Sequence, residues 1–430
     1  MVLGGRRARH RFTCLVQRGG AGRFGVREPG EAEMECEGRA VVGVVETSDW
    51  YDPAVYPEIR SAAPWVMEDM IEAQVRLPEM LGGSLAGSVP RLVEMLHAAV
   101  GAGEPVVVSA VGTSGHSARA VALILNGVMG ESAVAAGPAE ARESADQALA
   151  PRRKGLCIGI SHGGLSASTV RALGAAREAG AKTALITAAG DTPARDIADV
   201  VLTTPLRDKS YCHTVGYTAP VLAGFYLASA CRQEEFPAAG LAGYLRELLT
   251  MRSRALEIGR ALGQAERLVA AGSLIDVPTA RELALKVAEA AWIPTAMLGV
   301  EDTLHGHLVA HDANSALVVV VTGGPGAGRA AEGAHQLLMA ARRIGLQTAA
   351  ILSPDREGAI LSEDVTAGKL VIPPAALPEL VTSLLGGAVA LQLLTVGLVH
   401  ARKTNPDLLR REQAPYREAV AAGGAKQPRR

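Results

Sequence analysis

The sequence predicts an α/β protein of two tandem three-layer α/β/α domains, each built on a parallel sheet. Short apolar runs such as PVVVSAV (105–111), LCIGI (156–160) and TALITAA (183–189) alternate with helical patterns of about 10–15 residues, which is typical of βαβ units. The same order of elements recurs in the second half of the chain. A length of 430 residues leaves room for two such domains, each with its own core.

The composition narrows the class of protein. Hydrophobic residues make up 48% but aromatic residues only 3%, so the cores are built from Ala, Val and Leu. A formal charge of −1 gives no general attraction to nucleic acid or to anionic membranes, and neither is expected as a partner. The five widely spaced cysteines imply no disulfide framework, which favours the cytoplasm. No apolar run of transmembrane length is apparent.

The first hundred residues are expected to lie outside the two domains. Residues 1–45 are rich in Arg and Gly and lack the hydrophobic stretch of a secretory signal. We expect a disordered extension, or a start upstream of a true initiator such as Met34. Residues 46–100 carry Met67, Met70, Ile71 and Val75 at helical spacing and are predicted to form a helical lead-in.

The first domain is predicted to span residues 101–237. Strands are expected at 105–111, 156–160, 183–189 and 200–205. Helices are expected after the first two strands, at 191–198, and over the apolar segment 209–232. These alternating elements indicate right-handed crossovers and a sheet covered on both faces.

The second domain is predicted to span residues 266–402, after a helical connector at 238–265. Its strands are expected at 266–274, 316–322, 348–352 and 369–372, with helices from 276, at 330–344 and at 377–401. The similar spacing indicates an internal duplication. Residues 403–430 form a polar tail that we expect to reach the active site.

Two loops of the first domain have the composition of a phosphate site. Each follows a predicted strand and leads into a helix, where free backbone amides and nearby hydroxyls bind anions without a lysine. Ser and Thr are also common as simple helix caps. The candidate phosphate-binding residues are Thr113, Ser114, Ser161, His162 and Ser166.

The helix from residue 276 carries the candidate acid–base residues. Asp276 is predicted to cap it, with Pro278 in the first turn. Glu282, Lys286 and Glu289 follow at i, i+4 and i+7 and share one face. A carboxylate beside a lysine, with an imidazole such as His305 nearby, can move protons on a small polar substrate.

The alternative interpretation of this helix is structural. The acid–base face would then be solvated, with Glu–Lys pairs worth a few tenths of a kcal/mol each. The opposite face is expected to be the core stripe and consists of Leu283, Leu285, Val287, Ala288 and Ala291.

Other chemistries fit the sequence poorly. His305, His307 and His311 lack a nearby Cys, so no metal is expected. Neither half has a G-x-G-x-x-G fingerprint after its first strand, and no G-x-S-x-G elbow is present. No cofactor is therefore expected.

The segment ELALKVAEAAWIPTAMLGVEDTLHGHL, together with GTSGHSA, ISHGGLSAST and DKSYCHTVGYTA, resembles tandem SIS (sugar isomerase) domains, as in the isomerase half of glucosamine-6-phosphate synthase. The resemblance covers about residues 60–420 and implies a flavodoxin-like fold. It implies that Glu289 shuttles a proton between C1 and C2, with Lys286 near the substrate. It further implies that His305 opens the sugar ring in the neighbouring subunit's site, hence a homodimer.

The sequence departs from this family at three positions. Gly163 stands where a phosphate-binding serine is usual, Leu165 where the synthase has an acid, and Ala414 about where it has its Schiff-base lysine. Lys403 is the nearest tail lysine and is not assigned that role. Residues 1–60 are too short for a glutaminase domain, so glutamine-dependent synthesis is not expected.

Two functions remain open. The first is an enzyme on a sugar phosphate, isomerising aldose and ketose or releasing ammonia or an amine as a deaminase or deglycase. The second is a non-catalytic phosphosugar sensor, which the departures favour. Retention of Glu289, Lys286 and His305 favours the enzyme, because a sensor needs no base.

Overall fold

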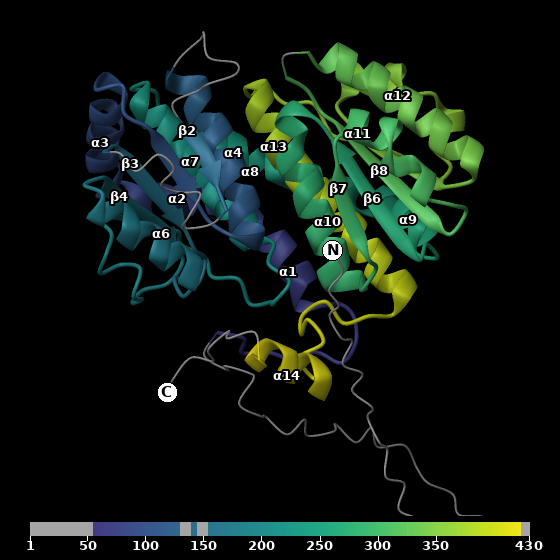
Figure 1. Cartoon of the computed structure of the whole chain (residues 1–430), viewed down its shortest axis with the longest axis horizontal. Coiled ribbons are helices and arrows are strands. Elements are labelled where there is room, and N and C mark those ends of the chain that lie inside the picture. Colours follow the sequence, from purple (N-terminus) through teal and green to yellow (C-terminus); the bar gives the residue numbers. More distant parts are fainter. Residues whose placement is uncertain (1–54, 130–138, 144–153, 325, 423–430) are drawn as a thin grey trace, which may run out of the picture. The chain divides into compact units, whose positions relative to one another are not determined.

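Two five-stranded parallel sheets organise the protein (Figure 1). The computed structural model describes residues 55–129, 139–143, 154–324 and 326–422. The prediction of two α/β domains with parallel sheets is confirmed. The extension expected at 1–45 lies outside the described residues.

The lead-in is helical where the structure describes it. It comprises α1 (Val66–Ala73), η1 (Gln74–Arg76), α2 (Leu77–Leu85) and α3 (Val89–Gly101). Leu77, Leu81 and Leu85 recur every fourth residue and are fully buried, because α2 packs against later helices of the chain.

The first sheet has the strand order β2-β1-β3-β4-β5. Its elements are β1 (Val106–Ser109), α4 (Gly112–Met129), β2 (Ala139–Arg142), β3 (Leu156–Ile160), α6 (Ala167–Glu178), β4 (Lys182–Thr187), β5 (Val200–Thr203) and α7 (Val215–Cys231).

Two elements of this domain differ from the prediction. The helix expected at 191–198 is wrong: the segment forms turns, and Pro193 near its start supplies no amide. Strand β2 was not predicted. Its sequence AEAR is short and poor in strand formers, and Asn126 fixes it by exchanging two 2.9 Å hydrogen bonds with the Ala139 backbone.

The second domain repeats this topology. After α8 (Ala238–Leu248) and α9 (Arg252–Leu262), its sheet has the order β10-β9-β8-β6-β7. In both domains an edge strand, β2 or β7, flanks the first strand on one side, and three later strands extend the sheet on the other. The elements are β6 (Arg267–Gly272), η3 (Leu274–Asp276), α10 (Val277–Ala291), β7 (Thr295–Leu298), α11 (Val300–His305), β8 (Ser315–Val321), α12 (Ala327–Ile344), β9 (Gln347–Leu352), β10 (Gly368–Val371) and α13 (Glu379–Arg402).

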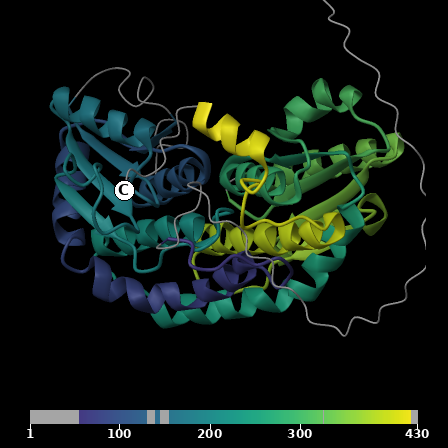
Figure 2. The same cartoon turned by 90° about the horizontal axis from the view of Figure 1, so that it is seen from below.

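Helix α13 is the central core helix. By length and composition it is apolar enough to cross a membrane, contrary to the sequence expectation, but 89% of its apolar window is buried inside the protein. A Cβ on Gly397 would lie 2.8 Å from the Leu256 carbonyl oxygen, so glycine allows α13 to cross α9 closely. Figure 2 shows α13 beside the purple lead-in helices.

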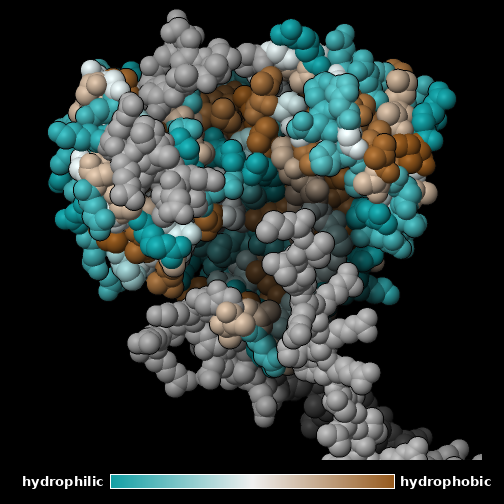
Figure 3. Space-filling view, in the orientation of Figure 1, coloured by the Kyte–Doolittle hydropathy of each residue, from teal (hydrophilic) through white to brown (hydrophobic). Residues whose placement is uncertain are grey.

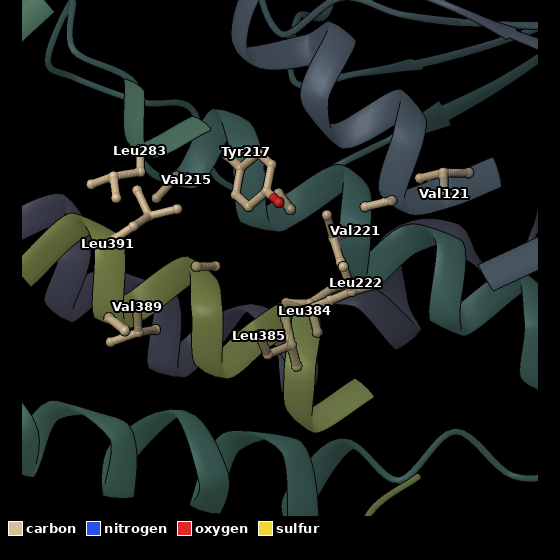
Figure 4. Close-up of a cluster of buried hydrophobic side chains, with 14 of the residues drawn as sticks. Val121, Val215, Tyr217, Val221, Leu222, Leu283, Leu384, Leu385, Val389 and Leu391 are labelled. Carbon is tan, nitrogen blue, oxygen red and sulfur yellow. The ribbon is translucent and has the colours of Figure 1, made fainter. Parts of the chain in front are cut away.

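The two domains share a core formed by α4, α7, α10 and α13. Figure 4 shows part of it, where Tyr217 of α7 lies among aliphatic side chains that include Leu283 of α10 and Leu391 of α13. Because α10 is held between the domains, a side chain on either of its faces can be buried.

Candidate active site

The charged face of α10 is buried. Glu282 and Lys286 side chains are each about 1% exposed, whereas Glu289 is 24% exposed. Lys286 Nζ lies 3.5 Å from Glu282 Oε1 and also forms an ion pair with Glu289. The solvated-face interpretation is therefore wrong for these residues. The expected core stripe is also partly wrong, since Ala288 is exposed.

Lys286 remains charged in this environment. Burial alone disfavours the ammonium form, but the carboxylates of Glu289 and Glu282 outweigh that penalty and raise the pKa of Lys286. The Lys286 ammonium thus pairs with the carboxylates of Glu282 and Glu289, and of these two only Glu289 is partly exposed to solvent.

The first domain contributes a fourth group, His116 of α4. Its Nδ1 lies 2.6 Å from Glu282 Oε2. The other oxygen, Glu282 Oε1, is buried without a hydrogen bond among the described residues. His116 lies inside the GTSGHSA motif, but sequence reasoning missed it because its partner is 166 residues away.

The first predicted phosphate loop forms the start of α4. Thr113 is buried and Ser114 half-buried, both in the first turn, where an α-helix leaves four amides without intrahelical partners. His116 follows one turn later. The predicted anion site thus lies on the same helix that reaches Glu282.

The second predicted phosphate loop follows β3 and is held by hydrogen bonds between its own residues. Ser161 Oγ accepts a hydrogen bond from the Ser166 amide at 3.4 Å, and Ser166 Oγ caps α6 by accepting one from the Thr169 amide at 3.4 Å. Gly164 has a φ of +67°, and a Cβ there would lie 2.3 Å from Thr192 Oγ1. The loop requires glycine at this position.

His162 points away from this loop's surface. Its side chain is buried, and Nε2 accepts a hydrogen bond from the Asp208 amide at 2.8 Å. Burial, with the neighbouring His213, lowers the pKa of His162 to about 3, so the ring is neutral. Only Nδ1 is left for a ligand.

The structure does not bring His305 to the α10 cluster. Its side chain is 81% exposed on α11, with Nε2 3.4 Å from Glu301 Oε2. The neighbouring Val309 is 91% exposed. Among the described residues, no group of three or more His, Cys, Asp or Glu side chains is placed to hold a metal ion.

The tail packs against the start of α1 and against Tyr211, in the segment before α7. Asp407 accepts 2.8 Å hydrogen bonds from the Val66 and Met67 amides. Arg411 lies 4.0 Å from the centroid of the Tyr211 ring. Burial lowers the pKa of His213 to about 3, and the charges of Lys286 and Arg411 add to this shift. Ala414 begins α14 (Ala414–Ala422). The described part of the tail therefore places an arginine, Arg411, near His213.

A comparison with protein families matches residues 104–230 to the SIS domain. This stretch is a SIS domain. No curated protein matches the chain by sequence.

Solved structures extend the likeness to the second domain. The C-terminal domain of glucosamine-fructose-6-phosphate aminotransferase from Francisella tularensis is 16% identical, with a TM-score of 0.66 covering 81% of this chain and 99% of that one. Tagatose-6-phosphate ketose/aldose isomerase from Escherichia coli is 20% identical, with a TM-score of 0.59 covering 82% and 97%. Glucosamine-6-phosphate deaminase from Thermotoga maritima is 14% identical, with a TM-score of 0.60 covering 80% and 97%. The whole described chain thus has the fold of tandem SIS domains.

Proposed function

We propose that this SIS protein is a sugar-phosphate isomerase, or an amino-sugar-phosphate deaminase, with Glu289 as its base. The observation that supports this most is the burial of Lys286 between Glu282 and Glu289. A purely structural pair would not need a fully buried ammonium that leaves one carboxylate at the rim.

The proposed reaction conserves all atoms. Glu289 removes the proton from C2 of the open-chain aldose, the C–H electron pair forms the C1–C2 double bond, and the carbonyl oxygen gains a proton. Return of a proton to C1, with loss of the proton on O2, gives the ketose. Lys286 orients the Glu289 carboxylate, and a positioned base of this kind contributes about 10²–10⁴-fold.

The sugar phosphate is proposed to bind at the start of α4 and at the loop after β3. The free amides near Thr113 and Ser114 and the hydroxyls of Ser161 and Ser166 supply donors there. We further propose a homodimer in which the partner's His305 opens the sugar ring, since His305 is exposed beside the apolar Val309.

The test is solvent-proton exchange followed by NMR in deuterated buffer. Fructose 6-phosphate, glucosamine 6-phosphate and fructosamine 6-phosphate are each incubated with wild type, Glu289→Gln and the exposed control Glu94→Gln. Deuterium at C1 or C2 with wild type and the control, but not with Glu289→Gln, is the expected result. Saturable binding without exchange would instead identify a phosphosugar sensor, which Gly163 and Ala414 favour because they replace the family's serine and lysine.

A further inference from the structure

The second domain contains a cavity at the carboxyl ends of three adjacent strands, β8, β9 and β10. Its volume is about 290 Å³. In open parallel sheets, ligands bind beyond the carboxyl ends of the strands. The residues that line it include Thr322, Ser353, Ile372, Glu379, Thr382 and Ser383.

This cavity is closed to phosphate by a carboxylate of the protein itself. The glycine loop after β8 is the topological counterpart of the phosphate loop after β3. Glu379 Oε1 accepts a 2.8 Å hydrogen bond from the Gly324 amide. Gly323 has a φ of +151°, and a Cβ there would lie 2.5 Å from the same oxygen. The loop is therefore folded around the Glu379 carboxylate, which would repel an incoming anion.

The remaining chemistry suits a positive, hydroxylated ligand. Among the residues that the structure describes, no Lys, Arg or His lines the cavity. Asp355 is neutralised by Arg356 at 3.1 Å, whereas Glu379 forms no salt bridge within the part of the chain that the structure describes. Ser353 and Thr382 line the wall, and Ile372, Pro373 and Leu377 give it an apolar side. The Ser353 and Thr382 hydroxyls donate to Asp355 and to the Glu379 carbonyl, so their oxygens can accept from a ligand hydroxyl.

The cavity is also connected to the catalytic helix. Thr322 on its floor donates its amide to Asp276 at 3.1 Å, and Ser383 Oγ donates to the Thr322 carbonyl at 2.9 Å. Asp276 directly precedes α10, and Lys286 lies ten residues further on, roughly 15 Å at 1.5 Å per residue. A ligand beside Glu379 would thus contact the residues that fix the start of α10.

We propose that this cavity is a second ligand site, which takes a small hydroxylated ammonium compound such as an unphosphorylated amino sugar. The ammonium group pairs with Glu379, and the ligand hydroxyls meet Ser353 and Thr382. This site is separate from the proposed catalytic site and does not depend on catalysis.

Calorimetric titration of the full chain with 2-amino-2-deoxyglucose tests the proposal, with glucose as the uncharged comparison. The amino sugar is expected to bind in the presence of saturating fructose 6-phosphate, which occupies the catalytic site. Glu379→Gln keeps the oxygen that accepts from Gly324 but removes the charge, and is expected to weaken binding about tenfold or more. Glu235→Gln, in a groove at the other side of α13's first turn, is the matched control.

Three results would overturn the proposal. They are the absence of saturable binding at millimolar amino sugar, equal affinity for wild type and Glu379→Gln, and displacement of the amino sugar by fructose 6-phosphate. An unchanged thermal midpoint for Glu379→Gln shows that its effect on binding is not caused by unfolding.

Discussion

His116 Nδ1 and Glu282 Oε2 lie 2.6 Å apart, and this contact joins the first domain to the second at the candidate site. The helix that carries the first predicted phosphate loop is thereby held against the helix that carries the proposed base. On the face drawn in Figure 3, hydrophobic residues show at the top centre, with further patches at the right and the lower left.

Removing His116 should destabilise the protein. His116→Ala leaves Glu282 buried with fewer partners, so we expect the free energy of unfolding to fall by about 1–3 kcal/mol. Urea denaturation measures this. His116→Gln, which keeps a donor, should recover part of the loss, and His97→Ala on the exposed face of α3 should have no effect. If both His116→Ala and His116→Gln lowered the free energy of unfolding equally, the hydrogen bond to Glu282 would not contribute and only the packing of the His116 ring would matter.

Lys286 and Glu282 should show strong coupling. Lys286→Met leaves two carboxylates without their shared cation and should cost about 3–5 kcal/mol, as for a broken buried ion pair. Adding Glu282→Met removes one of those charges, so the double variant should be less destabilised than the sum of the single variants. Additive losses in urea denaturation would contradict a direct interaction.

The loop after β3 offers a matched pair of glycines. A Cβ on Gly163 meets nothing within 4 Å, so Gly163→Ser should fold normally and, by restoring a hydroxyl, tighten fructose 6-phosphate binding about 2–10-fold. Gly164→Ser should instead destabilise the loop, because of its positive φ and the contact with Thr192. Titration calorimetry measures both affinities. No gain with Gly163→Ser would count against phosphate binding at this loop.

Strands that are formed by continuous apolar runs could be predicted from the sequence. Runs such as LCIGI at 156–160 form buried central strands, as expected. Strands β2 and β7 were missed because AEAR and TAML are only four residues long and contain no Val or Ile. The edge strand β5, VVLT, is equally short but was predicted, because Val and Leu favour a strand.

The burial of the α10 charges could not be predicted from spacing. Periodicity separates the two faces of a helix but does not say which face meets solvent. Here both faces are covered, so Glu282 and Lys286 are buried. The expected cap by Asp276 is wrong for a similar reason. Its side chain makes no capping hydrogen bond and turns to Thr322, 46 residues away.

Asp276 should make stability depend on pH. Burial raises its pKa from 3.8 to about 7, so the folded state holds a proton that the unfolded state releases. Stability from this group is therefore present below pH 4 and is lost as pH rises towards 7. Asp276→Asn should remove that loss. Between pH 5 and 8, the free energy of unfolding of the variant should therefore exceed that of wild type by up to a few kcal/mol.

Two buried histidines change the stability of the protein with pH in the direction opposite to Asp276, over part of the same pH range. The pKa values of His162 and His213 are lowered to about 3, so their contribution rises with pH up to about 6.5. The difference between wild type and Asp276→Asn isolates the aspartate, because the histidines are common to both. Parallel pH profiles would show that Asp276 is ionised throughout.

Mixed dimers should reveal whether His305 acts across a subunit interface. Glu289→Gln and His305→Ala are each expected to be inactive alone. Co-expressed in equal amounts, they should regain about a quarter of wild-type exchange activity, because half of the dimers are mixed and each mixed dimer has one intact site. If His305 served the Glu289 of its own chain, every site would lack one group and no activity would return. The exposure of His305, at 81%, on an element remote from the Lys286 contacts favours the first outcome.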